Sequence, residues 1–124
     1  MSELIYKEEA YVIIGKCMEV HNELRHGSSE VIYKDALEIE FSEADIFFER
    51  EKGCDVCYKG HILKSKYDAH FILYDKIIVG VKSVKDLKDE HVSPTINYLK
   101  VSGQKLAILV NFARSKLDYR RLVY

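Results

Sequence analysis

Ile77-Ile78-Val79-Gly80-Val81-Lys82-Ser83-Val84 is an apolar stretch interrupted by one glycine and one lysine. Its composition is typical of a buried β-strand. Successive strand side chains point to opposite faces of a sheet, so Gly80 and Lys82 share one face while Val79 and Val81 share the other. A lysine in such a strand is either solvated or held in a polar site, and the glycine beside it reduces packing. The pattern therefore predicts a special site on the face that carries Gly80 and Lys82.

The composition fits one compact globular domain spanning residues 1–124. Of the 124 residues, 48% are hydrophobic and 31% are charged, which is enough apolar material for a core. Nineteen basic residues balance twenty acidic ones, and the net charge is −1. No global field therefore attracts nucleic acid or anionic lipid, and any such binding must come from a local patch.

The chain has the features of a soluble, cytoplasmic protein that does not enter a membrane. No apolar run approaches the ~20 residues of a membrane span, and Met1-Ser2-Glu3-Leu4 lacks the pattern of a secretory signal. The odd number of cysteines, Cys17, Cys54 and Cys57, indicates reduced thiols. Cys54 and Cys57 form a CxxC in a strand-like stretch without a further ligand pair, which favours ordinary strand cysteines over a zinc or redox site.

Helical periodicity dominates the first third of the chain. Apolar residues recur at helical spacing over Ala10–Leu24, and Gly27 is expected to close this helix. On its apolar face, His21 is interpreted as a satisfied buried imidazole rather than a catalytic group. A second helix is expected to begin at Ser28 or Ser29, whose hydroxyls can cap backbone amides, with Glu30 in its first turn.

The rest of the chain favours strands and one more helix. Pro94 suits the first turn of a helix that continues to Gly103. Apolar runs predict strands from about Ile46 to Tyr58, from Ile62 to Leu73 as one or two strands, and over Ile77–Val84, Lys105–Phe112 and Tyr119–Tyr124. This order predicts the α/β class, more closely α+β: one mixed sheet flanked by helices.

Several blocks resemble one family in their order and spacing. Gly27-Ser28-Ser29-Glu30-Val31-Ile32-Tyr33 matches the signature of the GxxExxY protein family. The blocks around it are Val20-His21-Asn22-Glu23-Leu24, Asp75-Lys76-Ile77-Ile78-Val79 running into Lys82-Ser83-Val84, Asn97-Tyr98-Leu99-Lys100, and Leu109-Val110-Asn111-Phe112. The resemblance covers nearly the whole chain.

The resemblance implies a fold of the PD-(D/E)XK nuclease superfamily, whose members cut phosphodiester bonds with Mg²⁺ or Mn²⁺. In this chemistry two carboxylates hold a hard cation, which activates water and neutralises charge on the phosphate. Lys82 matches the family lysine, which orients the water or stabilises the phosphorus centre. Glu30 matches a helical glutamate that can join the metal shell, and Tyr33 and Tyr98 match the family tyrosines.

Three polar positions depart from the family pattern. The carboxylate two residues before the lysine is Gly80 here, and the metal-binding aspartate of the preceding strand falls on His70. The family glutamine of the third helix is Pro94. The resemblance therefore implies a degenerate active site, with Lys82 and Glu30 as its remnant.

These departures leave two functions open. The first is a non-catalytic module with no expected cofactor, which binds nucleic acid weakly, binds a protein partner or forms a homo-oligomer. The second is a nuclease with a rearranged site, in which Glu30, Asp68 and His70 hold Mg²⁺ or Mn²⁺ beside Lys82. Asp68 lies two residues before His70, on the same face but about 6–7 Å away. The local basic candidates for nucleic-acid contact are Lys85, Lys88, Lys116, Arg120 and Arg121.

Overall fold

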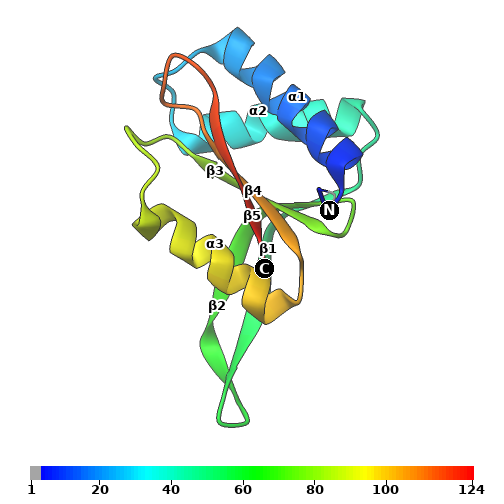
Figure 1. The fold of residues 1–124 in the computed structure, drawn as a ribbon, viewed down its shortest axis with the longest axis vertical. Helices are drawn as coiled ribbons and strands as arrows, with labels where there is room; N and C mark the ends of the chain where they lie inside the picture. The colour runs from blue at the N-terminus through cyan, green and yellow to red at the C-terminus, as the bar shows by residue number, and fades with distance from the viewer. Residues whose placement is uncertain (1–3) are drawn as a thin grey trace.

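A computed structural model describes residues 4–124 (Figure 1). The elements in chain order are α1 (Lys7–Leu24), α2 (Glu30–Glu43), β1 (Phe48–Tyr58), β2 (His61–Leu73), β3 (Ile77–Lys82), α3 (Asp89–Ser102), β4 (Leu106–Asn111) and β5 (Asp118–Val123). The five strands lie side by side in the order β1-β2-β3-β4-β5. β3 and β4 are parallel, and the other neighbours are antiparallel. The predicted α+β class, with one mixed sheet flanked by helices, is confirmed.

The two faces of the sheet are covered by different helices. Val79 and Val81 pack into the larger apolar cluster, which includes the buried residues of α1 and α2. Ile78 packs on the other side with Tyr98 and Leu99 of α3. Because side chains alternate along a strand, Gly80 and Lys82 share the α3 face with Ile78. Figure 1 shows α1 and α2 crossing at one end of the molecule, away from α3.

Two strand boundaries differ from the sequence prediction by two residues, and the others lie within one residue of it. β1 begins at Phe48 rather than near Ile46, because the Ile46 N–H donates to the carbonyl of Phe41 at the end of α2. β3 ends at Lys82 rather than Val84, because the side chain of Asn111 holds Val84 instead of a strand ladder. Asn111 accepts the Val84 N–H at 3.0 Å and donates to the Val84 carbonyl at 2.8 Å.

The helix boundaries bring two further corrections. α1 ends at Leu24, and Arg25, with a φ of 62°, takes the left-handed position expected for Gly27. Gly27 instead lies in the following loop with a φ of 107°. Pro94 does not lie in the first turn of α3: the helix begins at Asp89, five residues earlier, and Pro94 lies inside it. The acidic first turn, Asp89 and Glu90, matches the helix dipole and explains why the helix starts there.

The β1–β2 hairpin extends beyond the rest of the sheet (Figure 1). β2 forms one long strand, but its pairing with β3 is confined to Phe71–Leu73. The rest of β2 pairs with β1 alone. Lys59 and Gly60 form the turn that joins the two strands, with positive φ at both residues. Within residues 4–124, no helix is both long and apolar enough to cross a membrane.

Candidate functional site

A cavity of about 80 Å³ opens between α3 and the sheet face that carries Gly80 and Lys82. It brings together six residues that the sequence singled out: Asp68, His70, Gly80, Lys82, Pro94 and Tyr98. It also includes His91, Thr95 and Leu109, which sequence reasoning missed. His91, Thr95 and Tyr98 follow the i, i+4, i+7 spacing of one helix face, so a helix start at Asp89 would have revealed the two residues on α3.

The position of Gly80 is closed on one side by a leucine. A β-carbon built on Gly80 would lie 2.9 Å from Leu109 Cδ1 and 3.8 Å from Thr95 Oγ1. Leu109 pairs with Gly80 across the parallel β3–β4 ladder and is almost fully buried. The apolar side chain of Leu109 therefore occupies the space that a longer side chain at position 80 would enter.

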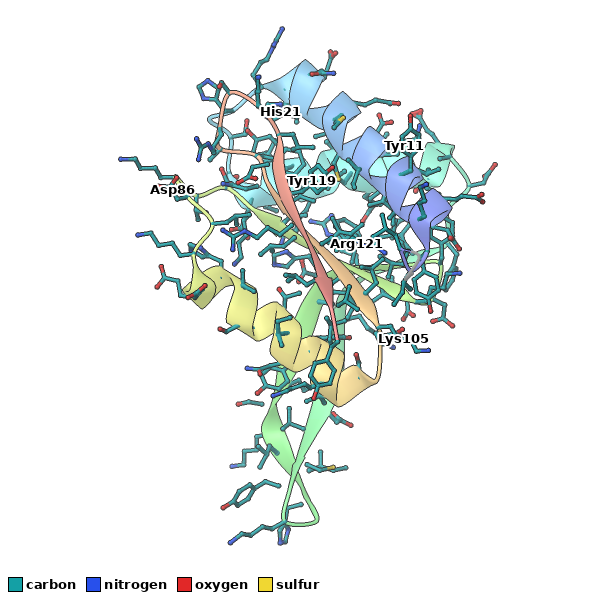
Figure 2. All side chains as sticks on the ribbon, viewed as in Figure 1. Tyr11, His21, Asp86, Lys105, Tyr119 and Arg121 are labelled. Atoms are coloured by element: carbon teal, nitrogen blue, oxygen red, sulfur yellow. The ribbon has the colours of Figure 1, made fainter. Side chains whose placement is uncertain are left out.

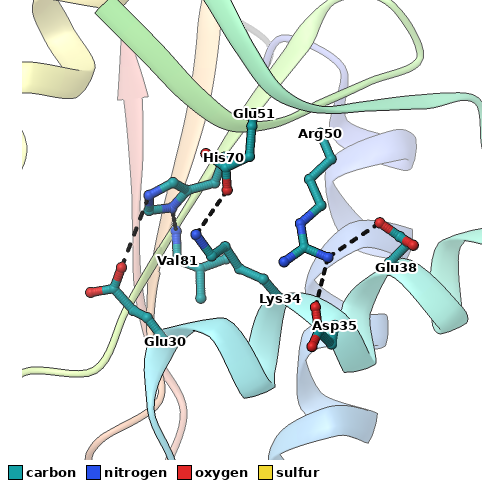
Figure 3. Close-up of polar contacts among 8 residues, drawn as sticks. All are labelled: Glu30, Lys34, Asp35, Glu38, Arg50, Glu51, His70 and Val81. Atoms are coloured by element: carbon teal, nitrogen blue, oxygen red, sulfur yellow. Dashed lines mark hydrogen bonds and ion pairs between the residues drawn. The ribbon is translucent and has the colours of Figure 1, made fainter.

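The His70 side chain takes the place of a main-chain hydrogen-bond acceptor at the point where β2 separates from β3. The Val81 N–H donates to His70 Nδ1 at 2.8 Å (Figure 3). Nδ1 must be unprotonated to accept this bond, so the neutral ring carries its proton on Nε2. Nε2 lies 4.0 Å from Glu30 Oε1. Both ring nitrogens thus face protein groups, one on β3 and one on α2.

The surroundings keep the His70 ring neutral. Burial lowers the pKa of His70, the nearby Lys34 ammonium lowers it further, and Glu30 and Glu51 act in the opposite direction. Lys34 is itself paired, since its ammonium lies 2.8 Å from Glu51 Oε1. Glu51, which has a φ of 54°, lies opposite His70, between the paired residues Arg50–Phe71 and Lys52–Ala69. Figure 3 shows these four side chains converging from α2, β1 and β2.

The loop before α2 positions Glu30. Tyr33 is fully buried and stacks on Phe112, with ring centroids 4.5 Å apart. Its hydroxyl donates to the Arg25 carbonyl at 2.6 Å and accepts the Ser28 N–H at 3.1 Å. The positive φ of Gly27 lets the chain turn between these two points. The Gly27 and Tyr33 motif positions thus fix the start of α2, where Glu30 is the first residue.

The remaining polar groups lie at different depths. Lys82 is half-buried, and in the described part of the chain no carboxylate lies within ion-pair distance of its ammonium. Asp68 is exposed at the edge of the cavity near the hairpin. The Tyr98 hydroxyl donates to the Lys52 carbonyl at 3.2 Å. Burial and the neighbouring acidic groups raise the pKa of Tyr98 to about 12, so its phenol stays a hydrogen-bond donor at neutral pH.

Comparison with known proteins identifies the family. A family model described as the PD-(D/E)XK nuclease superfamily matches residues 7–122. The chain belongs to the PD-(D/E)XK nuclease superfamily. A search of curated proteins finds no match. Among solved structures, the crystal structure of SSO0001 is similar in fold, with a TM-score of 0.59 and 20% sequence identity over 76% of this chain. The matched region spans half of that protein's chain (50%).

The chemistry of the PD-(D/E)XK superfamily requires ligands for a hard cation, which prefers several oxygens. At the cavity, Asp68 offers a carboxylate, but Gly80 offers only its backbone. His70 has Nδ1 engaged by Val81, and Glu30 does not line the cavity. Within residues 4–124, no three His, Cys, Asp or Glu side chains gather closely enough to hold a metal ion. These residues do not fit a divalent cation in the observed arrangement.

Two of the basic residues proposed for nucleic-acid contact in this PD-(D/E)XK domain lie on different sides of the sheet. Arg120 and Arg121 point to opposite faces of β5. The Arg120 guanidinium donates to the Leu87 carbonyl, and the Arg121 guanidinium donates to the Ile5 carbonyl. Figure 2 shows Arg121 and Tyr119 on the side of β5 that faces α1. The other three candidates are Lys85 and Lys88, in or next to the β3–α3 loop, and Lys116, in the β4–β5 loop.

The histidine and the cysteines that the sequence set aside do not line the cavity. His21 is buried, and its Nε2 donates to the Arg114 carbonyl at 2.8 Å. This agrees with its interpretation as a satisfied imidazole. Cys17, Cys54 and Cys57 are free thiols. Burial raises the pKa of Cys17 to about 12, so it stays a neutral core residue.

Proposed function

We propose that this chain is a GxxExxY-type member of the PD-(D/E)XK superfamily whose metal centre has degenerated. It binds nucleic acid without cutting it. The observation that carries the proposal is the contact at Gly80: the carboxylate that should stand two residues before Lys82 is missing, and Leu109 occupies the adjoining space. Without that carboxylate, the main electrostatic attraction for a hard cation is weakened.

The environment of His70 supports the same proposal. The aspartate expected there would present oxygens to a cation, whereas His70 accepts the Val81 N–H through one nitrogen and directs the other toward Glu30. A metal at His70 Nε2 would have to displace the proton that faces the carboxylate. The arrangement favours a neutral ring with a structural role.

A rearranged nuclease is the second candidate function. It is favoured by one observation, namely that Asp68, His70 and Lys82 line the same cavity. If His70 released Val81, its ring and Asp68 could supply two ligands, with Glu30 approaching from α2. Such a site would prefer an ion softer than Mg²⁺, because imidazole is a softer ligand than carboxylate.

One assay tests both candidates. Purified protein is incubated with single-stranded DNA, duplex DNA and RNA in Mg²⁺ or Mn²⁺, and cleavage and binding are followed in parallel. The proposal predicts weak, salt-dependent binding and no cleavage, since a near-neutral chain contacts phosphates only through local lysines and arginines. Cleavage that disappears in Lys82→Ala and with chelator would replace it by the rearranged nuclease.

A further inference from the structure

The distal part of the β1–β2 hairpin is a two-stranded ribbon that no other element covers. We define the hairpin tip as residues 55–66, which are exposed except for the half-buried Val56. Figures 1 and 2 show this ribbon projecting from the end of the sheet, with its side chains directed into solvent. Neither the cavity nor the apolar clusters on the two faces of the sheet include any residue of the tip. The hairpin tip is therefore a surface without a role in the packing of the domain.

The base of the hairpin is braced by α3. Tyr98 donates to the Lys52 carbonyl at 3.2 Å. Cys54 and Tyr67, a directly opposed pair on β1 and β2, pack against the smaller apolar cluster beneath α3. Asp68, which follows Tyr67, lines the cavity. The base from which the tip projects is thus packed beneath α3, next to the cavity.

The hairpin tip is positively charged on a chain that is slightly negative. It contains three lysines, Lys59, Lys64 and Lys66, and one acidic residue, Asp55. Its net charge is +2 with histidine neutral, while the whole chain carries −1, so the rest of the chain carries −3 in total. Lys66 lies 3.4 Å from Asp55. In the described part of the chain, Lys59 and Lys64 have no carboxylate within ion-pair distance.

Exposed apolar and aromatic side chains stand beside these lysines. Tyr58, Ile62 and Leu63 expose 58%, 67% and 42% of their surface. The Lys59 ammonium lies 5.5 Å from the centre of the Tyr58 ring. Such a surface suits a nucleic acid. The lysines can contact its phosphates, while the aromatic and aliphatic groups can contact thymine methyl groups and sugar carbons.

We propose that the hairpin tip enters the major groove of duplex DNA. The groove is about 12 Å wide and admits a two-stranded β-ribbon. The two arms of the tip, residues 55–58 and 61–66, are roughly 13 Å and 20 Å long at ~3.3 Å per residue, and both exceed the groove depth of about 8.5 Å. The major groove of A-form RNA is too deep and narrow for such entry. The inference rests on the nucleic-acid binding proposed above, and it specifies duplex DNA as the ligand and the hairpin tip as the surface that binds it.

The test compares two double variants that change the net charge equally. Lys59→Glu/Lys64→Glu reverses the two unpaired lysines of the tip. Lys7→Glu/Lys105→Glu reverses two exposed lysines elsewhere on the molecule. Fluorescence anisotropy measures the affinity of each protein for a labelled DNA duplex and for an RNA duplex of the same sequence, over a series of salt concentrations. Thermal melting verifies that both variants fold.

The proposal predicts that the tip variant binds DNA about tenfold or more weakly than the control variant, with a salt slope lower by roughly two. It also predicts that the native chain binds the DNA duplex more tightly than the RNA duplex. Equal affinities of the two variants would overturn the tip assignment while leaving nucleic-acid binding intact. The role of the tip lysines would then be to prevent edge-to-edge association between sheets. Equal binding of both duplexes would overturn groove entry. No binding by the native chain would overturn both proposals.

Discussion

His70 joins three elements through one neutral ring. Its Nδ1 accepts the Val81 N–H, its Nε2 faces Glu30, and the Lys34 ammonium lies close enough to lower its pKa. Protonation would remove the acceptor and place a cation near Lys34. The folded chain therefore prefers the unprotonated ring, and this preference makes its stability depend on pH.

Acidification should destabilise the native chain through His70. Because burial lowers its folded pKa below the unfolded value of about 6.5, the unfolded chain binds more protons between the two values. This stabilisation is complete above about pH 6.5 and is lost as the pH falls toward the folded pKa. His70→Asn keeps an acceptor oxygen near the Val81 N–H but cannot titrate.

Urea unfolding of both proteins measures the difference, from about pH 7.5 down to about pH 5, a window that lies above the usual range of carboxyl pKa values. The free energy of unfolding should fall more steeply in the native chain than in His70→Asn. Parallel curves would show that His70 carries no proton linkage.

A substitution at Gly27 tests the conformation of the loop that positions Glu30. Its φ of 107° is unfavourable for any other residue, although a β-carbon there would meet no atom within 4 Å. Gly27→Ala should therefore cost more than about 1 kcal/mol through backbone strain alone. Gly15 is the matched control, since it lies within α1 and also has nothing within 4 Å.

Gly15→Ala should stabilise the chain by roughly 0.5–1 kcal/mol, because alanine has the higher helix propensity. Denaturant midpoints of the two variants should move in opposite directions. A Gly27→Ala variant as stable as the native chain would remove the conformational explanation for the motif glycine.

At the scale of elements, α3 contains a local conflict. Pro94 lies inside the helix, where it cannot donate the N–H that would bond to the Glu90 carbonyl. Its side chain is exposed, so little packing is lost if it is replaced. Pro94→Ala should raise the free energy of unfolding by about 1–3 kcal/mol.

Ser93→Ala, at the neighbouring exposed position, is the control and should change stability by only a few tenths of a kcal/mol. Chemical denaturation of the three proteins provides the comparison. If Pro94→Ala is less stable than the native chain, the proline ring contributes packing at the cavity that outweighs the lost hydrogen bond.

Sequence reasoning located most elements but not their ends. Periodicity found three helices and the strands, because apolar spacing follows burial directly. It placed Pro94 in the first turn of α3 and so overlooked His91, which accepts the Lys88 N–H through Nδ1. It also gave Gly27 the role of Arg25, since a glycine is the usual but not the required residue at a helix end.

At the scale of the whole molecule, the site was predictable only in part. Strand alternation correctly placed Gly80 and Lys82 on one face, and both line the cavity. The role of Leu109 was invisible, because it depends on a parallel β3–β4 register set by the tertiary fold. The reach of the hairpin tip was equally hidden, because it depends on β2 leaving β3 at Phe71.

The central claim is that this PD-(D/E)XK domain lacks a site for a hard divalent cation. Calorimetric titration with Mn²⁺ tests it on the native chain and on His70→Asp/Gly80→Glu, which restores both carboxylates beside Lys82. A β-carbon at position 80 crowds the flexible end of Leu109, which can turn aside, and meets Thr95 only at an ordinary contact distance. We predict no saturable binding by the native chain and binding by the variant, whose crowded carboxylates gain from the cation. Binding of Mn²⁺ by the native chain as tightly as by the variant would contradict the claim.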